Sequence, residues 1–305
     1  MGIRIYKEPE LEKPILIACW PGIGNIGLIA VDTLRAKLGA EEFAEIEPWE
    51  FFYPKKLIIR SDELIDLEFP GSKFYFKRTE QKDLIFFIGE EQPAWGGRAY
   101  AEGSKAYQMA NLVLDIALKY GCQKIYTSGA AVTSIHHTMK PKVWAVPNTE
   151  TLIHELKGYD NTLLMSDIEG MGGHGNISGL NGLLLGVAKK RGLSAICLMG
   201  EIPIYLQGFP IIYPKASKSV LELLTYTTRV SIDMTEISDL AERSEIEINK
   251  MYEKLPPDAK EQLDRLKTAP HARNIDTSKI TEEDKKKILE DIDKFFQRGS
   301  EKDGN

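Results

Sequence analysis

Residues 15–27 read ILIACW and then PGIGNIG, and this stretch decides the fold. The first six residues, 15–20, form a nearly continuous apolar run, which is typical of a strand covered on both faces of a sheet. The glycines after it allow a tight turn, and apolar residues then follow at helical spacing over 25–38. The stretch therefore predicts a strand, a glycine turn and a helix, the repeating unit of α/β proteins.

The same alternation continues to about residue 213. Short apolar runs predict three more buried strands, and helical spacing predicts three more helices. The strands are 84–88, 124–127 and 195–199, and the helices are 99–120, 149–156 and 179–191. This alternation predicts a three-layer α/β/α sandwich, with a mixed and mostly parallel sheet and right-handed crossovers.

Residues 47–78 interrupt the alternation. Three apolar runs in this segment are separated by pairs of turn-forming residues. In chain order these are 57–59, Ser61-Asp62, 64–69, Pro70-Gly71 and 74–76. The pattern predicts a small antiparallel meander at one edge of the sheet.

After Pro214 only helical patterns remain. One apolar stripe lies over 220–224 and a second over 237–255, where Pro256-Pro257 ends the helix. A short helix to about Lys267 is expected to follow.

A last helix is expected from Thr281 onward, with Thr281 as its N-cap. Its large apolar residues repeat at helical spacing and are Ile288, Leu289, Ile292, Phe295 and Phe296. Two alternatives are open for this stripe, since it packs either on the chain's own body or on a partner. We expect two domains, the sandwich over 1–230 and a helical C-terminal extension over 231–305.

Composition narrows the class of protein. The net charge of the 305 residues is −6, and no stretch alternates Lys and Arg with aromatic residues, so nucleic acid is not an expected partner. The three cysteines, Cys19, Cys122 and Cys197, are odd in number and lie in or beside apolar runs, as buried reduced thiols do. The N-terminus has no apolar region of signal-peptide length, and glycines break both long uncharged stretches. We therefore expect a cytoplasmic protein with no membrane partner.

The glycines Gly22, Gly24 and Gly27 match the spacing of a dinucleotide-binding turn. Glu45 or Glu47 would then stand at about the distance that reads a ribose. Three interpretations are open: a turn that lets helix and strand pack closely, an anion or phosphate site that includes Asn25, and an NAD site.

A second glycine cluster spans 170–179 and includes Gly173 and His174. Its backbone can bend N–H groups around an anion or move as a flap, and it is equally compatible with a loop that binds nothing.

Acidic residues follow two of the predicted strands. Glu90 and Glu91 come after one strand and Glu201 after another. Because the carboxyl ends of parallel strands meet at one edge, these three carboxylates are candidates for one cleft, as acid and base or as cation ligands. The alternative is that they are solvated or cap helices.

No residue stands out as catalytic. Ser128 and Cys19 are the nucleophile candidates, but neither lies in a Gly-x-Ser-x-Gly elbow. His136 and His137 are adjacent, so on a strand or helix they would point apart, and the histidines show no metal-ligand spacing. We therefore expect no metal and no cofactor. The candidate ligand-binding residues are Gly22, Gly24, Asn25, Gly27, Glu90, Glu91, Ser128, Gly173, His174 and Glu201.

Five motifs carry a resemblance to a known family. They are Pro21-Gly22-Ile23-Gly24-Asn25-Ile26-Gly27, Gly89-Glu90-Glu91-Gln92-Pro93, Tyr126-Thr127-Ser128-Gly129, Ile177-Ser178-Gly179-Leu180-Asn181-Gly182-Leu183-Leu184 and Gly200-Glu201-Ile202-Pro203. In their order and spacing, over about residues 14–255, the chain resembles the proteasome assembly chaperone 2 family.

The resemblance implies a phosphorylase/hydrolase-like α/β/α sandwich that forms a homo-oligomer, with a trimer favoured. It also implies a protein partner, since some members help proteasome subunits to assemble. The chain departs from the family at its end, Lys302-Asp303-Gly304-Asn305, where members that dock on proteasome rings are expected to carry a hydrophobic residue, Tyr and one further residue. This departure argues against ring docking through the C-terminus.

Three functional hypotheses result. The first is a non-enzymatic protein-binding or assembly factor, chaperone-like and homo-oligomeric. The second is a phosphorylase- or hydrolase-type enzyme with a phosphate or oxyanion seat at Gly22–Gly27. The third is a nucleotide-binding oxidoreductase that uses NAD.

Overall fold

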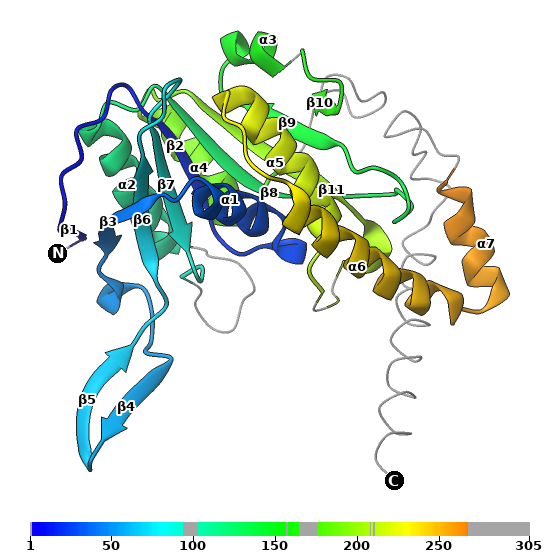
Figure 1. Cartoon of the computed structure of the whole chain (residues 1–305), viewed down its shortest axis with the longest axis horizontal. Coiled ribbons are helices and arrows are strands. Elements are labelled where there is room, and N and C mark those ends of the chain that lie inside the picture. Colours follow the sequence, from blue (N-terminus) through cyan, green and yellow to red (C-terminus); the bar gives the residue numbers. More distant parts are fainter. Residues whose placement is uncertain are drawn as a thin grey trace.

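The protein is represented by a computed structural model that describes residues 2–93, 103–156, 158–164, 176–207, 209 and 211–267. Within these residues, nine strands form one sheet and two more form a separate hairpin (Figure 1). In spatial order the sheet contains β1 (Ile3–Ile5), β3 (Glu41–Ile46), β6 (Ser72–Lys77), β7 (Leu84–Gly89), β2 (Ile15–Cys19), β8 (Lys124–Thr133), β11 (Ala195–Pro203), β9 (Val143–Pro147) and β10 (Thr162–Leu164). The hairpin consists of β4 (Lys56–Arg60) and β5 (Glu63–Glu68).

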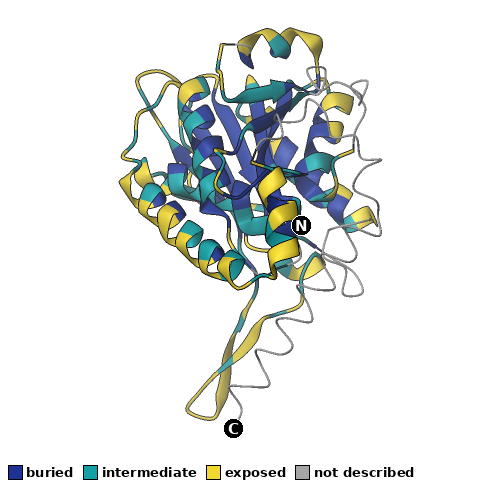
Figure 2. Ribbon diagram, turned by 90° about the vertical axis from the view of Figure 1, so that its right-hand side faces the viewer, coloured by how far each residue is buried: buried dark blue, intermediate teal, exposed yellow. Residues whose placement is uncertain are grey.

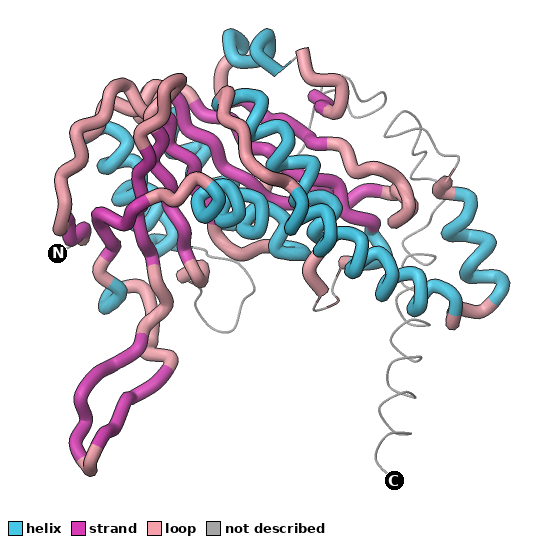
Figure 3. The backbone as a smooth tube through the Cα atoms, in the orientation of Figure 1, coloured by secondary structure: helices cyan, strands magenta, loops and turns pink. Residues whose placement is uncertain are grey.

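Helices cover both faces of the sheet (Figure 3). They are α1 (Ile26–Lys37), α2 (Gly103–Lys119), α3 (Ile153–Leu156), α4 (Gly179–Lys190), α5 (Pro214–Thr228), α6 (Thr235–Glu253) and α7 (Pro257–Arg265), with short 3-10 turns at Ile23–Asn25, Pro48–Glu50, Glu150–Leu152 and Ile204–Leu206. One core cluster joins the sheet to α1, α5 and α6, and another joins its opposite face to α2 and α4. The predicted three-layer α/β/α arrangement is thus confirmed.

The sheet is mixed, with a parallel centre. The adjacent strands β7, β2, β8 and β11 run parallel, and they are the four strands that the apolar runs predict. Ile15 and Ile17 of β2 face one core cluster, whereas Leu16 and Ala18 face the other. Because both faces are covered, every residue of β2 is buried, and this is why its sequence is continuously apolar. Figure 2 shows the interior of the sheet as mostly buried.

Two strands are longer than predicted, and this changes the setting of two candidate residues. β8 continues to Thr133 and β11 to Pro203, in parallel register with each other. Ser128 and Glu201 therefore lie inside strands in the middle of the sheet, and Glu201 does not stand in a loop beyond a strand.

The predicted edge meander is wrong in its placement. Only β6 enters the main sheet, where it pairs antiparallel with both β3 and β7. β4 and β5 pair only with each other and project from the body (Figure 1). The hairpin that the turn residues predict is present, but it is an arm outside the sheet.

The helical C-terminal region is confirmed for α5, α6 and α7. α6 buries Ile237 and Ile248 in the same core cluster that contains α1 and α5. The helix expected from Thr281 lies outside the described residues, and the boundary at residue 230 stays a prediction. None of the helices in the described segments is both long and apolar enough to cross a membrane.

The glycine turn allows α1 to approach the sheet very closely. A Cβ atom on Gly27 would lie 2.6 Å from the carbonyl carbon and oxygen of Ser128 and 2.9 Å from Sγ of Cys19. No real Cβ occupies so short a distance, so only glycine permits this contact. The interpretation of the turn as a packing device therefore has a direct structural basis at Gly27.

We predict that Gly27→Ala destabilises the fold by about 1–3 kcal/mol, because the added methyl group must push α1 off β8. The matched control is Gly22→Ala. Gly22 has an extended backbone, and a Cβ atom added there would have nothing within 4 Å, so its substitution should change stability by no more than about 0.5 kcal/mol. Urea unfolding of both variants measures the difference, and equal midpoints would show that Gly27 has no special packing role.

Candidate functional site

The five sequence motifs meet at the carboxyl edge of the parallel strands. Asn181, at the start of α4, bridges the backbone of Trp20: its Oδ1 accepts a hydrogen bond from the Trp20 N–H at 3.3 Å, and its Nδ2 donates to the Trp20 carbonyl at 3.4 Å. Thr127 donates its hydroxyl to the carbonyl of Asn181 at 2.9 Å. Three segments that lie far apart in the sequence are therefore joined through one residue, Asn181, by its amide side chain and its backbone carbonyl.

Gln92 makes a second bridge at this junction. Its Nε2 donates to the carbonyl of Pro21 at 2.6 Å, and its Oε1 accepts from the N–H of Leu180 at 3.1 Å. The loop after β7 is thereby tied to both the glycine turn and the start of α4. Gln92 and Asn181 lie within the quoted motifs but were not among the candidate residues. The signal that could have identified Asn181 was an amide among the apolar residues of a helix.

The glycine turn itself is packed from one side. Gly24 has a φ of 61°, and a Cβ there would lie 3.1 Å from Cδ1 of Ile202. The Tyr213 N–H donates to the carbonyl of Gly24 at 2.9 Å, and the Asn25 N–H donates to that of Gly22 at the same distance. Ile202 and Tyr213 thus cover the turn at Gly24, and the opposite side at Gly22 is open.

Neither candidate nucleophile is activated. Ser128 is 1% exposed and donates its hydroxyl to the carbonyl of Leu198 at 2.9 Å. Burial raises the pKa of the Cys19 thiol well above its ordinary value, and its sulfur lies near the carbonyls of Trp20 and Ser128. All three cysteines are buried and unpaired, as predicted.

The three candidate carboxylates do not share a cleft. Glu201 is fully buried and accepts hydrogen bonds from the Lys142 N–H at 2.9 Å and from Nε1 of Trp144 at 3.0 Å. Glu90 lies after β7, and two strands separate β7 from β11, which is about 14 Å of sheet. Paired acid and base chemistry between them is therefore not supported.

Glu90 and Glu91 belong instead to the base of the hairpin. Glu90 accepts from the Gly71 N–H and from Nζ of Lys55, both at 3.0 Å. The hydrogen bond from Gly71, followed by the Lys55 contact, lowers the pKa of Glu90. Glu91 lies 3.6 Å from the same ammonium group. Gly173 and His174 lie outside the described residues.

We predict that Asn181→Ala destabilises the protein by about 1–3 kcal/mol, because it leaves the buried backbone groups of Trp20 without their side-chain partner. Gln123→Ala, which removes an exposed amide from the turn before β8, is the matched control and should be nearly neutral. Thermal unfolding of the two variants tests the role of the bridge. Equal melting temperatures would contradict it.

His136 and His137 form a buried pair that the sequence pattern did not reveal. They lie in the turn after β8, where their ring centroids are 4.1 Å apart. The expectation that they point apart applied to a strand or a helix, and the pair lies in neither. His137 contacts the Tyr205 hydroxyl through Nδ1 at 2.7 Å and Oδ1 of Asn249 through Nε2 at 2.8 Å. The pair therefore fastens α6 to the carboxyl edge of the sheet.

The surroundings of His136 disfavour its charged form. Burial, followed by the neighbouring His137 and Lys267, lowers the pKa of His136 from about 6.5 to about 4, although Asp264 opposes the shift. Nε2 of His136 is buried and has no hydrogen-bond partner among the described residues. The neutral imidazole is thus the form that fits the folded state.

We predict that His136 makes stability depend on pH. His136 takes up a proton at about pH 6.5 in the unfolded chain and only at about pH 4 in the folded chain. Its contribution to the free energy of unfolding is therefore complete above pH 6.5 and decreases as the pH falls to 4. His136→Phe should reduce the slope of unfolding free energy against pH in this window, whereas His154→Gln, an exposed residue of α3, serves as the control. An unchanged slope in the His136→Phe protein would contradict the assignment.

The hairpin arm, residues 56–68, has one apolar and one charged face. Leu57 pairs with Leu67 and Ile59 with Leu64, so these four side chains share a face. The other face carries the cross-strand pairs of Lys56 with Glu68, Ile58 with Asp66 and Arg60 with Glu63. The arm is almost entirely exposed (Figure 2).

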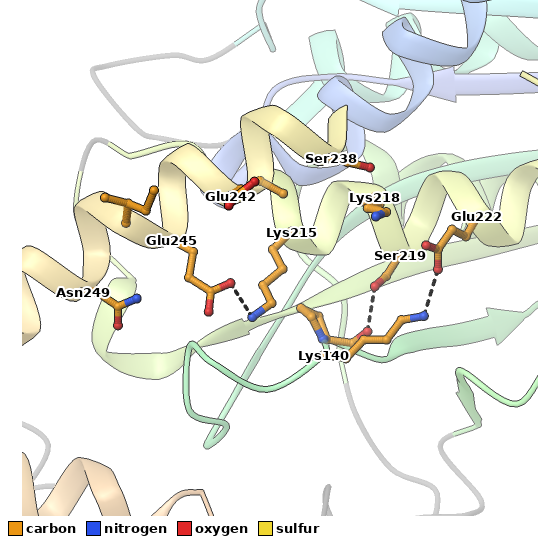
Figure 4. A pocket seen from close by; sticks show the side chains of 12 residues that line it. Lys140, Lys215, Lys218, Ser219, Glu222, Ser238, Glu242, Glu245 and Asn249 are labelled. Carbon is orange, nitrogen blue, oxygen red and sulfur yellow. Dashed lines mark hydrogen bonds and ion pairs between the residues drawn. The ribbon is translucent and has the colours of Figure 1, made fainter. Parts of the chain in front are cut away.

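A groove runs between α5 and α6, and we call it the α5–α6 groove. Its volume is about 590 Å³, and its lining includes Lys140, Pro141, Lys218, Glu242, Ile246 and Asn249. Lys215 pairs with Glu245 at 2.8 Å, and Lys140 pairs with Glu222 at 3.1 Å (Figure 4). Within the described part of the chain, Lys218 and Glu242 have no ion-pair partner.

The described residues contain no group of three or more His, Cys, Asp or Glu side chains that could hold a metal ion. At the motif junction, the hydrogen bonds of Asn181 and Gln92 join neighbouring segments of backbone, and the glycine turn has an open side at Gly22.

Comparison with known proteins gives a consistent result. The family model described as the PAC2 family matches residues 16–252. The uncharacterized protein MJ1210 of Methanocaldococcus jannaschii is 31% identical over 250 residues, which cover 81% of this chain and 87% of that protein.

Solved structures agree with the fold. PbaB of Pyrococcus furiosus, described as an archaeal proteasome activator, is 30% identical with a TM-score of 0.68, and the match covers 81% of this chain and 97% of PbaB. PbaA of the same organism, described as an archaeal homologue of proteasome-assembly chaperone, has a TM-score of 0.59 at 21% identity, covering 86% of this chain and 98% of PbaA. The likeness to PbaA supports the fold alone.

Proposed function

The chain belongs to the PAC2 family, and from this membership we propose that it is a non-enzymatic, chaperone-like factor that binds other proteins and associates with copies of itself. The resemblance carried by the five motifs is thereby confirmed at the level of the family. We propose proteasome components as the protein partners, in line with the description of the relative PbaB. We also propose that the protein works in the cytoplasm.

The observation that carries this proposal is how the polar side chains of the motifs are used. Gln92, Thr127, Ser128 and Asn181 each bond to a backbone group of a neighbouring motif or strand. An activated nucleophile requires a base within hydrogen-bond reach, and Ser128 is bonded to a carbonyl instead. These residue types at this edge of the sheet support a rigid scaffold better than a reaction.

The exposed surface supports a role in protein binding. Of the large apolar side chains that are exposed in the described residues, six lie within the stretch from Trp49 to Ile65: Trp49, Tyr53, Leu57, Ile59, Leu64 and Ile65. Such a concentration is typical of a protein interaction site. Neither the hydrolase nor the oxidoreductase hypothesis gains a comparable observation among the described residues.

We predict that the purified protein forms a specific complex with proteasome subunits of its own cell. The protein is mixed with unassembled α-subunits and, separately, with assembled 20S particles, and native mass spectrometry with cross-linking identifies the complexes. We expect a complex of defined stoichiometry with the unassembled α-subunits, with the 20S particles, or with both. An unrelated acidic protein of similar size is the control for charge-driven contacts.

Stabilisation by a small ligand is the result that would contradict this proposal. A ligand present at a hundred times its dissociation constant stabilises a protein by about 2.7 kcal/mol, which raises the melting temperature by several degrees. A shift of that size with phosphate, nucleosides or NADH, together with no complex with either proteasome form, would overturn the proposal in favour of an enzyme. Gly22→Ala tests the location of such a ligand without disturbing the packing of the turn.

A further inference from the structure

We infer that the tip of the hairpin arm of one copy inserts into the α5–α6 groove of the next copy, so that identical chains join head to tail. This inference rests on the proposed self-association and names the two surfaces that produce it. Three features support it: the construction of the arm, the charges of the groove, and the positions of both on the fold.

The arm is built to hold a defined shape at its tip. Arg60 pairs with Glu63 across a two-residue turn, and both turn residues, Ser61 and Asp62, have positive φ values of 50° and 68°. Positive φ at both central residues is the mark of a type I′ turn, whose twist matches that of paired strands. The tip therefore presents Arg60, Asp62 and Glu63 in a fixed arrangement.

The arm buries too little apolar surface within itself to be stable as an isolated hairpin. An isolated two-stranded hairpin is marginal in water, because it buries too little apolar surface. Here Leu57, Ile59 and Leu64 are 59%, 68% and 54% exposed on one face. Ordering the arm thus requires a surface that covers this face, and the described body of the same chain does not supply it.

The groove complements the tip in charge. Lys218 on α5 and Glu242 on α6 face the groove without ion-pair partners among the described residues (Figure 4). The acidic Asp62 and Glu63 are suitable partners for Lys218, and Arg60 is suitable for Glu242. Ile246 lines the same groove and is 47% exposed, which gives the apolar side chains next to the tip a contact.

The groove also fits the tip in size. Its volume of about 590 Å³ lies within the range of roughly 300–1,000 Å³ that holds a compact ligand. A two-residue turn with the side chains that flank it is of this scale, whereas a helix or a whole strand pair is larger.

The arm that enters the groove is inferred to come from a second copy, because the two surfaces lie at different ends of the sheet of one chain. The arm is attached to β6, and the groove lies over α5, which packs on β11 and β9. β6 and β11 are four strand spacings apart, about 19 Å. The hairpin β4–β5 projects away from α5 and α6 (Figure 1). One chain thus offers an arm at one end of its sheet and a groove at the other. Contacts between two different surfaces of identical chains close into a ring when the rotation permits.

The test uses two complementary variants. In the arm variant, Ile59→Lys and Leu64→Glu replace the apolar cross-strand pair nearer the tip by an oppositely charged one, which removes half of the apolar face while preserving the pairing. In the groove variant, Lys218→Glu reverses the unpaired charge. Lys190→Glu, at an exposed position on α4 across the sheet, is the matched control, and Glu242→Lys is a second groove variant.

Sedimentation and native mass spectrometry of the full chain give the result. We expect the wild type and Lys190→Glu to form a closed oligomer, and the arm and groove variants each to fall to the monomer mass of 34.3 kDa. A one-to-one mixture of the arm variant and the groove variant should form a heterodimer, because one intact arm and one intact groove remain. Circular dichroism verifies that the arm variant and the groove variant are folded. If the Lys218→Glu protein is not folded, Glu242→Lys serves as the groove variant.

Other results overturn the inference. A monomeric wild type would reject it together with self-association, whereas variants that keep the wild-type mass would reject these two surfaces and leave self-association standing. Monomeric variants that do not combine on mixing would show that the arm and the groove do not meet each other. Because no proteasome component is present, each outcome is separate from the test of partner binding.

Discussion

The approach of α1 to the backbone of β8 is the constraint on which the rest of the fold depends. Helices normally stand off a sheet by the length of their side chains, but Gly27 brings the first turn of α1 to the backbone of Ser128. The same device recurs nearby, since a Cβ on Gly200 would lie 2.9 Å from Cγ2 of Ile26 and 3.0 Å from the carbonyl of Ala216 in α5. Two helices are thus seated on the sheet through glycines.

The polar side chains at the carboxyl edge of the central strands are used in hydrogen bonds within the protein. In many α/β proteins the carboxyl ends of the strands open into a ligand crevice. Here the amides of Asn181 and Gln92 occupy that position and hold loops to each other. The rigid body that results is suited to carrying other surfaces, such as the arm, at fixed positions.

The central fold could be predicted from the sequence because its pattern is local. The strands β2, β7, β8 and β11 are covered on both faces, so each appears as an uninterrupted apolar run. The true ends of β8 and β11 could not be seen, since Ser128 and Glu201 look like residues beyond a strand. Their polar groups are acceptable inside the sheet only because partners from other strands and loops satisfy them, and those partners are distant in sequence. The stacked histidines were missed for the same reason, because α6 completes their environment.

The irregularity in the hairpin has a consequence for how this chain can change over time. The register shifts between Ile58 and Ile59, and Ile65 is the extra residue that the shift accommodates. In a regular hairpin with the same turn, Asp66 would stand opposite Leu57 and Leu67 would leave the apolar face. The bulge therefore keeps the apolar and charged faces of the arm in place although β5 is one residue longer than β4. Deletion of Ile65 would remove the bulge and still leave Leu67 opposite Leu57, so β5 can lose this residue without exchanging its two faces. In a hairpin without a bulge, the same loss would move every later side chain to the opposite face.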